Sequence, residues 1–124
     1  MIILMKKKIL IIDDELELRH ALNERLTSVG YSVIEAWNGR EGLEKVVTEK
    51  PDLILLDLTM PEMDGMTTLQ ELRRCEETKR IPVIIMTAKG ETVSIMDFQA
   101  LKVADYFTKP FDSKELISYI ERYI

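Results

Sequence analysis

Five short apolar runs alternate along this chain with longer stretches in which apolar residues recur every three or four positions. The runs cover residues 8–12, 32–36, 52–56, 82–86 and 104–107. This alternation predicts an α/β domain, in which a parallel sheet carries helices on both faces. The first, third and fourth runs each contain an uninterrupted apolar stretch, which is typical of strands inside a parallel sheet. The second and fifth runs mix polar with apolar residues and suit the sheet edges, so we expect a doubly wound sheet in the order 2-1-3-4-5.

The stretches between the runs have the apolar spacing of amphipathic helices. Gly30 is expected to end the first helix as its C′ residue. Gly42 lies inside the second helix, where glycine should cost about 0.5–1 kcal/mol relative to alanine. Asp112 and Glu115 predict a capping box at the start of the last helix. The predicted apolar stripes are Leu18, Leu22, Leu26 and Val29; Leu43, Val46 and Val47; Met66, Leu69 and Leu72; Val93, Met96, Ala100 and Leu101; and Leu116, Ile117, Ile120 and Ile124.

The whole-chain composition fits an ordinary globular protein. With 124 residues, 46% of them hydrophobic, the chain can bury one core but not two, so we expect a single domain over residues 1–124. Residues 1–5 could form an N-terminal extension. The formal net charge of -5 argues against a broad electrostatic interaction with nucleic acid. Cys75 is the single cysteine, which favours a reducing compartment. The apolar start precedes the basic residues 6–8, the reverse of an export signal, and no apolar run could span a bilayer, so we expect a cytoplasmic protein.

Polar side chains follow four of the five predicted strands at the point where each strand ends. Asp13 and Asp14 follow the first strand, Asp57 the third, Thr87 the fourth and Lys109 the fifth. In an open parallel sheet, these carboxyl ends form one crevice, where such folds bind their ligands. Three close carboxylates repel one another unless a cation joins them. Oxygen ligands of this kind suit Mg²⁺, whose charge together with that of Lys109 would cancel the charge of the three aspartates.

This combination also has a chemical use. An aspartate beside a divalent metal and a lysine can act as a covalent nucleophile toward phosphoryl groups, and the two cations stabilise charge on the transferred oxygens. The Thr87 hydroxyl could hydrogen-bond the resulting acyl phosphate. Taken singly, a strand-end aspartate is more often a helix cap or turn residue, Thr87 a turn residue and Lys109 a solvated side chain. Only their conjunction at four strand ends favours a functional site.

Four segments resemble the receiver domain of two-component response regulators. They are Asp13-Asp14, residues 57–65 (Asp-Leu-Thr-Met-Pro-Glu-Met-Asp-Gly), Thr87-Ala88 and residues 109–111 (Lys-Pro-Phe). The resemblance covers essentially the whole chain and implies a flavodoxin-like (βα)5 fold. It also implies a stand-alone, phosphorylation-controlled switch rather than an enzyme, with Mg²⁺-dependent self-phosphorylation and self-dephosphorylation as its only chemistry.

The resemblance implies a role for each matching residue. Asp57 would be the phosphoacceptor and a metal ligand. Asp14 would be a direct Mg²⁺ ligand, Asp13 would act through a metal-bound water, and the backbone carbonyl of Thr59 would complete the protein ligands. Lys109 would pair with the phosphoryl oxygens.

Other implied features concern the switch and the backbone. Thr87 and Tyr106 would form the switch pair, with the hydroxyl moving toward the phosphoryl group and the ring moving inward behind it. A cis peptide bond is expected between Lys109 and Pro110. Many receivers carry Gly-Ala where this chain has Lys102-Val103, and a left-handed Lys102 would cost about 1–2 kcal/mol.

The expected partners are proteins. The phosphoryl donor would be a sensor histidine kinase or a histidine phosphotransfer protein, and the output a downstream protein contact or onward phosphotransfer. We expect neither direct nucleic-acid binding nor membrane insertion, and either a monomer or a weak phosphorylation-dependent dimer. Lys89 is expected to alter the lifetime of the phosphorylated state, and His20 to face solvent rather than to take part in phosphotransfer.

Two alternatives come from other functional classes. A Mg²⁺-dependent phosphohydrolase would use an aspartyl-phosphate, but such enzymes usually carry Asp-x-Asp on one strand, where this chain has Asp57-Leu58-Thr59. A flavodoxin-like cofactor binder is permitted by the fold. An acidic rim without a glycine-rich phosphate loop is, however, a poor place for a flavin phosphate.

Overall fold

The computed structural model describes residues 6–58, 64–88 and 99–124. Five parallel strands form one sheet in the order β2-β1-β3-β4-β5, which confirms the predicted topology. The strands are β1 (Lys8–Ile12), β2 (Ser32–Ala36), β3 (Leu53–Asp57), β4 (Val83–Ala88) and β5 (Asp105–Lys109). The described helices are α1 (Leu16–Ser28), α2 (Gly39–Glu49), α3 (Gly65–Arg74) and α5 (Ser113–Tyr123). The fourth predicted helix lies mostly outside the described residues.

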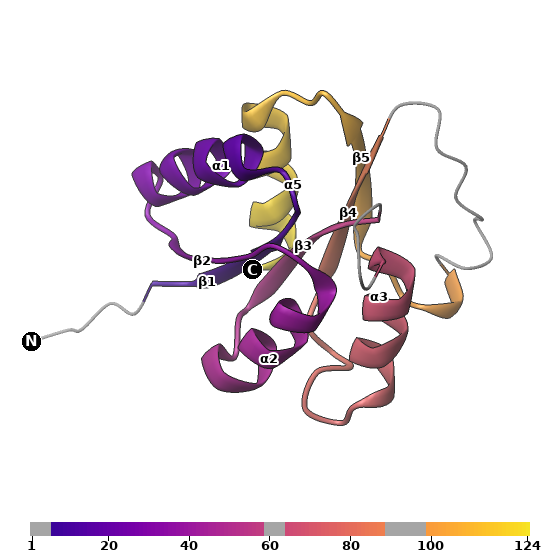
Figure 1. Cartoon of the computed structure of the whole chain (residues 1–124). Helices are drawn as coiled ribbons and strands as arrows, with labels where there is room; N and C mark the ends of the chain where they lie inside the picture. Colours follow the sequence, from indigo (N-terminus) through magenta and orange to yellow (C-terminus); the bar gives the residue numbers. More distant parts are fainter. Residues whose placement is uncertain (1–5, 59–63, 89–98) are drawn as a thin grey trace, which may run out of the picture.

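The sheet lies between two layers of helices, with α1 and α5 on one face and α2 and α3 on the other (Figure 1). Successive side chains of a strand point to opposite faces, so each buried strand serves both layers. Ile9 and Ile11 pack with the cluster under α1 and α5, whereas Leu10 and Ile12 pack with the cluster under α2 and α3. All four side chains are fully buried, which explains why the sequence of this strand is continuously apolar.

The register of the sheet brings its polar strand ends to one edge. Asp57 is opposite Met86 in the β3–β4 pair, and Thr87 is opposite Thr108 in the β4–β5 pair. β1 pairs with β3 up to Ile12, one residue before Asp13. The three predicted carboxylates and Lys109 therefore share the carboxyl edge of the sheet.

Helix ends agree with most of the sequence predictions. Gly30 follows α1 with a φ of 105°, a conformation that glycine adopts without strain. The Asp112 side chain caps α5, but it accepts from the backbone N–H of Lys114, two residues on, rather than from the Glu115 N–H that a capping box would use. The predicted stripe of α5 is buried at Leu116, Ile117 and Ile120.

Three residues of the predicted apolar stripes are exposed instead: Val29, Val47 and Ala100. Val47 is 67% exposed, because it lies one position beyond the buried face that Val46 defines on α2. Val29 is 45% exposed, because it follows α1 as the C-cap residue and no longer lies on the helical stripe. Gly42 has a packing reason within α2, since a Cβ there would lie 2.5 Å from the Ile12 side chain.

The connection into β5 is unusual at Lys102. This residue has a φ of 53°, so Lys102 adopts the left-handed conformation whose cost the sequence analysis considered. Arg73 of α3 holds the same connection by donating to the backbone carbonyls of Leu101 and Lys102, at 2.7 and 3.3 Å. Burial lowers the pKa of this guanidinium, which nevertheless remains charged.

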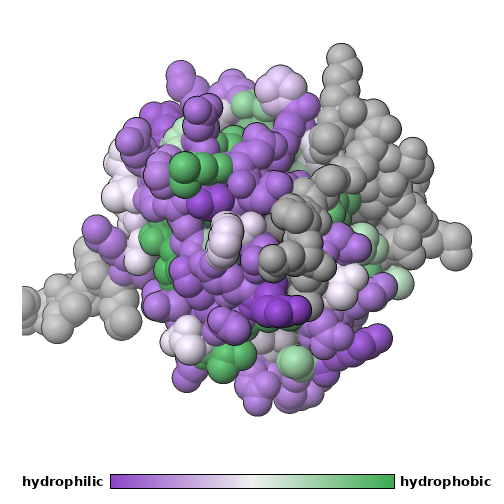
Figure 2. Space-filling view, in the orientation of Figure 1, coloured by the Kyte–Doolittle hydropathy of each residue, from purple (hydrophilic) through white to green (hydrophobic). Residues whose placement is uncertain are grey.

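The outer surface in the view of Figure 2 is mostly hydrophilic, with hydrophobic residues scattered over it. Within the described part of the chain, no helix is long and apolar enough to cross a membrane.

Candidate functional site

The carboxyl edge of the sheet holds an acidic cluster. Asp13 and Asp14 follow β1, and Asp57 is the last residue of β3. Carboxylate oxygens from the three residues lie within 4.8 Å of one another. Asp13 is fully buried and Asp57 is 3% exposed, whereas Asp14 faces solvent. The cluster therefore combines two carboxylates shielded from water with one that is open to it.

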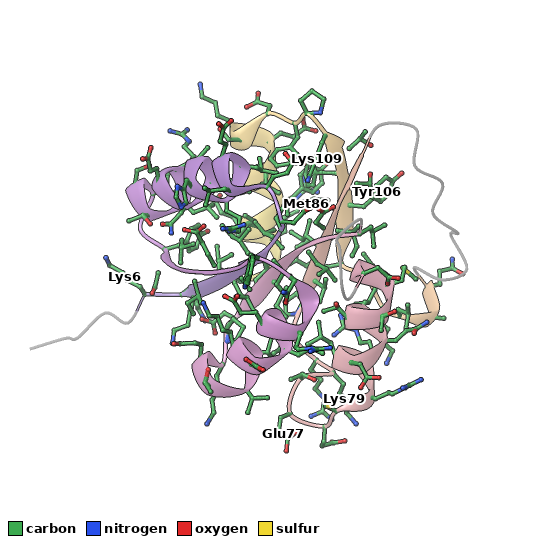
Figure 3. All side chains as sticks on the ribbon, in the orientation of Figure 1. Lys6, Glu77, Lys79, Met86, Tyr106 and Lys109 are labelled. Carbon is green, nitrogen blue, oxygen red and sulfur yellow. The ribbon has the colours of Figure 1, made fainter. Side chains whose placement is uncertain are left out.

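Lys109, at the end of β5, reaches across the sheet edge into this cluster. Its ammonium lies 2.9 Å from Oδ2 of Asp13, 3.1 Å from Oε1 of Glu15 and 3.6 Å from Oδ2 of Asp57. Lys109 and Tyr106 lie toward one end of the sheet in Figure 3, and Glu77 and Lys79 lie toward the other. One ammonium thus contacts three carboxylates, and with Asp14 the described residues place four carboxylates around Lys109 at this edge.

The pKa directions reflect this imbalance. Burial raises the pKa of Asp13 above its ordinary value of 3.8, although hydrogen bonds from Lys109 and from the Glu15 backbone oppose the change. Burial alone would lower the pKa of Lys109, but its contacts with Asp13, Asp57 and Glu15 outweigh that effect and raise it. The lysine therefore stays protonated at neutral pH, whereas the ionised form of Asp13 is less stable in the folded protein than in water.

Asp13 is fixed from several directions. Its Oδ1 accepts the backbone N–H of Glu15 at 2.8 Å, and its own N–H donates to the carbonyl of Ala36 at 3.0 Å. Its carbonyl accepts from Arg19 at 2.7 Å, and the same guanidinium donates to Glu35 at 3.1 Å. Both carboxylate oxygens of Asp13 are therefore already engaged before any metal binds.

The backbone around Asp57 depends on a close approach by α3. A Cβ on Gly65 would clash with the carbonyl oxygen of Asp57 and would lie 2.5 Å from Cα of Leu58. The N–H of Gly65 donates to the Leu58 carbonyl at 2.9 Å, and Asp64 caps the helix by accepting from the N–H of Thr67 at 2.8 Å. Gly65 is thus the residue that lets α3 begin directly beside the acidic edge.

The predicted switch residues lie on the adjacent strands β4 and β5, with Thr87 opposite Thr108 and Tyr106 opposite Ile85. The buried Thr87 hydroxyl donates to the backbone carbonyl of Phe107 at 3.3 Å. Tyr106 is 55% exposed, so its ring points outward. The peptide bond between Lys109 and Pro110 is cis, as predicted.

The structure brings together Asp13, Asp14, Asp57 and Lys109 at one edge. Thr59 and Lys89 lie outside the described residues. His20 is exposed, as predicted, at 61% of its side chain. Glu15 was not predicted from the sequence, although its carboxylate lies 3.1 Å from the Lys109 ammonium; the only signal was that it extends the acidic run Asp13-Asp14-Glu15.

This geometry agrees with a family comparison. The model of the response regulator receiver domain matches residues 9–121, nearly the whole chain. The chain belongs to the response regulator receiver domain family. As a receiver domain it is a phosphorylation-controlled signalling switch of two-component systems, and it belongs to a family of signalling proteins rather than of classical enzymes.

Individual relatives support the same assignment. The chain is 40% identical to sporulation initiation phosphotransferase F of Bacillus subtilis over 121 residues, covering 98% of this chain and 96% of that protein. It is 42% identical to the probable transcriptional regulator ycf27 of Cyanophora paradoxa over 111 residues, which are 90% of this chain and 45% of that protein. The receiver domain therefore spans about half the length of several curated relatives. Among solved structures, chemotaxis protein CheY4 of Vibrio cholerae matches with a TM-score of 0.88 and 27% identity, over 97% of this chain and 100% of that one.

Proposed function

We propose that Asp57 is the residue of this receiver domain that accepts the phosphoryl group. The observation that carries the proposal is the placement of Asp57 at the end of a buried strand, with Lys109 3.6 Å away and two further aspartates beside it. Its side chain is 4% exposed, so little of the carboxylate is open to solvent. A nucleophile in that position faces cationic stabilisation on one side and potential metal ligands on the other.

The cation that fits this edge is Mg²⁺. The donors are all carboxylate oxygens, which hard divalent cations prefer, and they bring more negative charge than Lys109 can balance. Asp14 and Asp57 would bind the ion directly, and the carbonyl of Thr59, outside the described residues, would add a ligand. Asp13 would act through water, because Lys109 and the Glu15 N–H already occupy its two oxygens. When bound, Mg²⁺ would offset negative charge on the phosphoryl oxygens.

The reaction is a transfer of one phosphoryl group. A carboxylate oxygen of Asp57 attacks phosphorus, the bond from phosphorus to the donor's imidazole nitrogen breaks, and that nitrogen retains the electron pair. Lys109 pairs with the phosphoryl oxygens as they approach. In the separate hydrolysis step that ends the phosphorylated state, a water attacks phosphorus, the bond between phosphorus and the Asp57 oxygen breaks, and the products are the Asp57 carboxylate and inorganic phosphate. No other side chain needs to form a covalent bond.

The structural change that follows phosphorylation would begin at Thr87. Its hydroxyl would leave the Phe107 carbonyl for a phosphoryl oxygen, and the Tyr106 ring would move from its exposed position toward the space behind it. The changed surface would be the face of the fourth helix, β5 and α5. Its described part includes Tyr106, Phe111 and Tyr119 around a hollow of about 450 Å³. A protein that recognises only one arrangement of this face would then follow the state of Asp57.

We further propose a protein donor and a protein target. Receiver domains interact with histidine kinases or phosphotransferases, and one relative is itself a sporulation phosphotransferase. A histidine kinase or histidine phosphotransfer protein would supply the phosphoryl group here, and a downstream protein would receive the signal or the group.

The test is an intact-mass measurement after incubation with acetyl phosphate and Mg²⁺. The wild-type chain should gain one phosphoryl group, and Asp57→Asn should gain none. Addition of a chelator should also prevent the gain. Phosphorylation of Asp57→Asn to the wild-type extent would contradict the assignment.

A further inference from the structure

Glu15 occupies a position at which glutamate is an unusual choice. It is the N-cap residue of α1, where Ser, Thr, Asp or Asn normally accepts a hydrogen bond from the first turn, yet its side chain makes no capping bond. Instead it extends to Lys109, with its Oε1 3.1 Å from the ammonium. The side chain of Glu15 therefore contacts Lys109 at the acidic edge and does not cap its own helix.

The three carboxylates around Lys109 differ in freedom. Asp13 is buried and held by backbone hydrogen bonds, and Asp57 is almost completely buried at a strand end. The Glu15 side chain, in contrast, is 61% exposed. The ammonium is closer to Asp13 and Glu15 than to Asp57. Glu15 is thus the most exposed of the three carboxylates, and it competes with Asp57 for the ammonium of Lys109.

We propose that Glu15 is a positioning residue that holds Lys109 in the unphosphorylated site and restrains phosphorylation of Asp57. This inference rests on the proposed function of Asp57. When phosphoryl oxygens arrive, Lys109 must give up or share its contact with Glu15 to pair with them. The carboxylate of Glu15 then remains beside a group of like charge. Both effects oppose the phosphorylated state, and both depend on a side chain that reaches the lysine.

The test compares three variants at neutral pH and saturating Mg²⁺. Glu15→Gln removes the charge. Glu15→Asp keeps the charge but is one methylene shorter, and aspartate at the N-cap would turn to the first turn of α1 instead of Lys109. Glu17→Gln is the matched control, because Glu17 is an exposed acidic residue in the first turn of the same helix. Two quantities are measured for each: the rate of phosphorylation by acetyl phosphate and the equilibrium affinity for beryllofluoride, a phosphoryl mimic, by calorimetry.

Glu15→Gln and Glu15→Asp should both be phosphorylated about two- to fivefold faster and bind beryllofluoride about two- to fivefold more tightly, the factor that corresponds to an exposed ion pair. Glu17→Gln should match the wild type in both measurements. If Glu15→Asp had the wild-type phosphorylation rate and beryllofluoride affinity, a negative charge at position 15 would be sufficient without the Lys109 contact. That result would overturn the proposal. Unchanged or slower phosphorylation of Glu15→Gln would overturn it as well. Failure of the wild type itself to take up a phosphoryl group would instead refute the function of Asp57, and this inference with it.

Discussion

The two edges of the sheet differ in how their charged side chains are paired. At the amino edge, the Lys8 ammonium donates to the carbonyl of Glu49 at 2.8 Å and lies 3.4 Å from its carboxylate, while the Lys8 N–H donates to Asp52 at 2.8 Å. At the carboxyl edge, the ammonium of Lys109 faces Asp13, Glu15 and Asp57, with Asp14 beside them. Lys8 at the amino edge has local partners for its charge, whereas at the carboxyl edge the described residues place four carboxylates around one lysine. This excess of negative charge fits the Mg²⁺ site and the phosphoryl transfer proposed above.

The largest expected difference between the edges is their response to Mg²⁺. A ligand that binds only the folded protein adds about 2.7 kcal/mol to the free energy of unfolding at a concentration 100 times its Kd. Thermal or urea unfolding of the wild type with and without Mg²⁺ should show a gain of this size. Asp14→Asn should lose most of the gain, and Asp52→Asn at the amino edge should keep it. An equal loss in both variants would show that the two edges do not differ in this way.

A second comparison sets the glycines near the two edges against each other. Gly65→Ala should lower the free energy of unfolding by about 1–3 kcal/mol, because the added methyl group clashes with the backbone at Asp57 and Leu58. Gly30→Ala should cost about 1 kcal/mol for its positive φ alone, since nothing lies within 4 Å of its added Cβ. Urea unfolding measures both costs. Gly65→Ala should also slow phosphorylation, whereas Gly30→Ala should not. Normal phosphorylation of a folded Gly65→Ala would show that the start of α3 does not affect the reaction at Asp57.

Neutralising one carboxylate at each edge should change stability in opposite directions. Without Mg²⁺ and at neutral pH, Asp13→Asn should raise the free energy of unfolding by on the order of 1 kcal/mol. The reason is that burial raises the pKa of Asp13, so its ionised form is less stable in the folded protein than in the unfolded chain. Asp52→Asn should lower it by about 0.5–1 kcal/mol, because the oxygen that accepts from the Lys8 N–H loses its charge and the hydrogen bond becomes weaker.

The pH dependence of the Asp13 effect follows from the direction of its pKa. A raised carboxyl pKa favours the folded state below the ordinary value of 3.8, and that contribution is lost as the pH rises through the folded pKa. The advantage of Asp13→Asn over the wild type should therefore be largest at neutral pH and shrink as the solution is acidified. Urea unfolding at a series of pH values measures this difference. An advantage that grows on acidification would mean that the pKa of Asp13 is depressed.

The smallest expected effect concerns Lys102, in the connection that enters β5 from the amino edge. Its φ of 53° is strained for a lysine, and glycine would remove this strain. Glycine also makes the unfolded chain more flexible, which offsets part of the gain. On balance, Lys102→Gly should raise the free energy of unfolding by about 0.5–1 kcal/mol. Lys79→Gly, in the neighbouring connection and without a positive φ, provides the contrasting control and should show no gain. Chemical denaturation of the three proteins is sufficient. A loss of stability in Lys102→Gly would show that its side chain contributes more than its backbone costs.

The two edges also differ in what the sequence could predict. The interior strands could be predicted because a strand buried on both faces is continuously apolar. The edge strands β2 and β5 could be predicted because they mix polar with apolar residues. Asp13, Asp14, Asp57 and Lys109 were found because a parallel sheet brings its carboxyl ends together. Glu15 was missed because its contact with Lys109 joins residues 94 positions apart, and an acidic N-cap gives no sign of turning away from its helix. The exposure of Val47 was missed because its apolar side chain fits a stripe as well as Val46 does.

The most direct test of this account is to locate the phosphoryl group after reaction with acetyl phosphate and Mg²⁺. Borohydride reduction converts an aspartyl phosphate to homoserine, which peptide mass spectrometry can assign to one residue. The account predicts homoserine at position 57 and at no other aspartate. Reduction at position 13 or 14, or a stable phosphate on His20 or on a hydroxyl side chain, would contradict it.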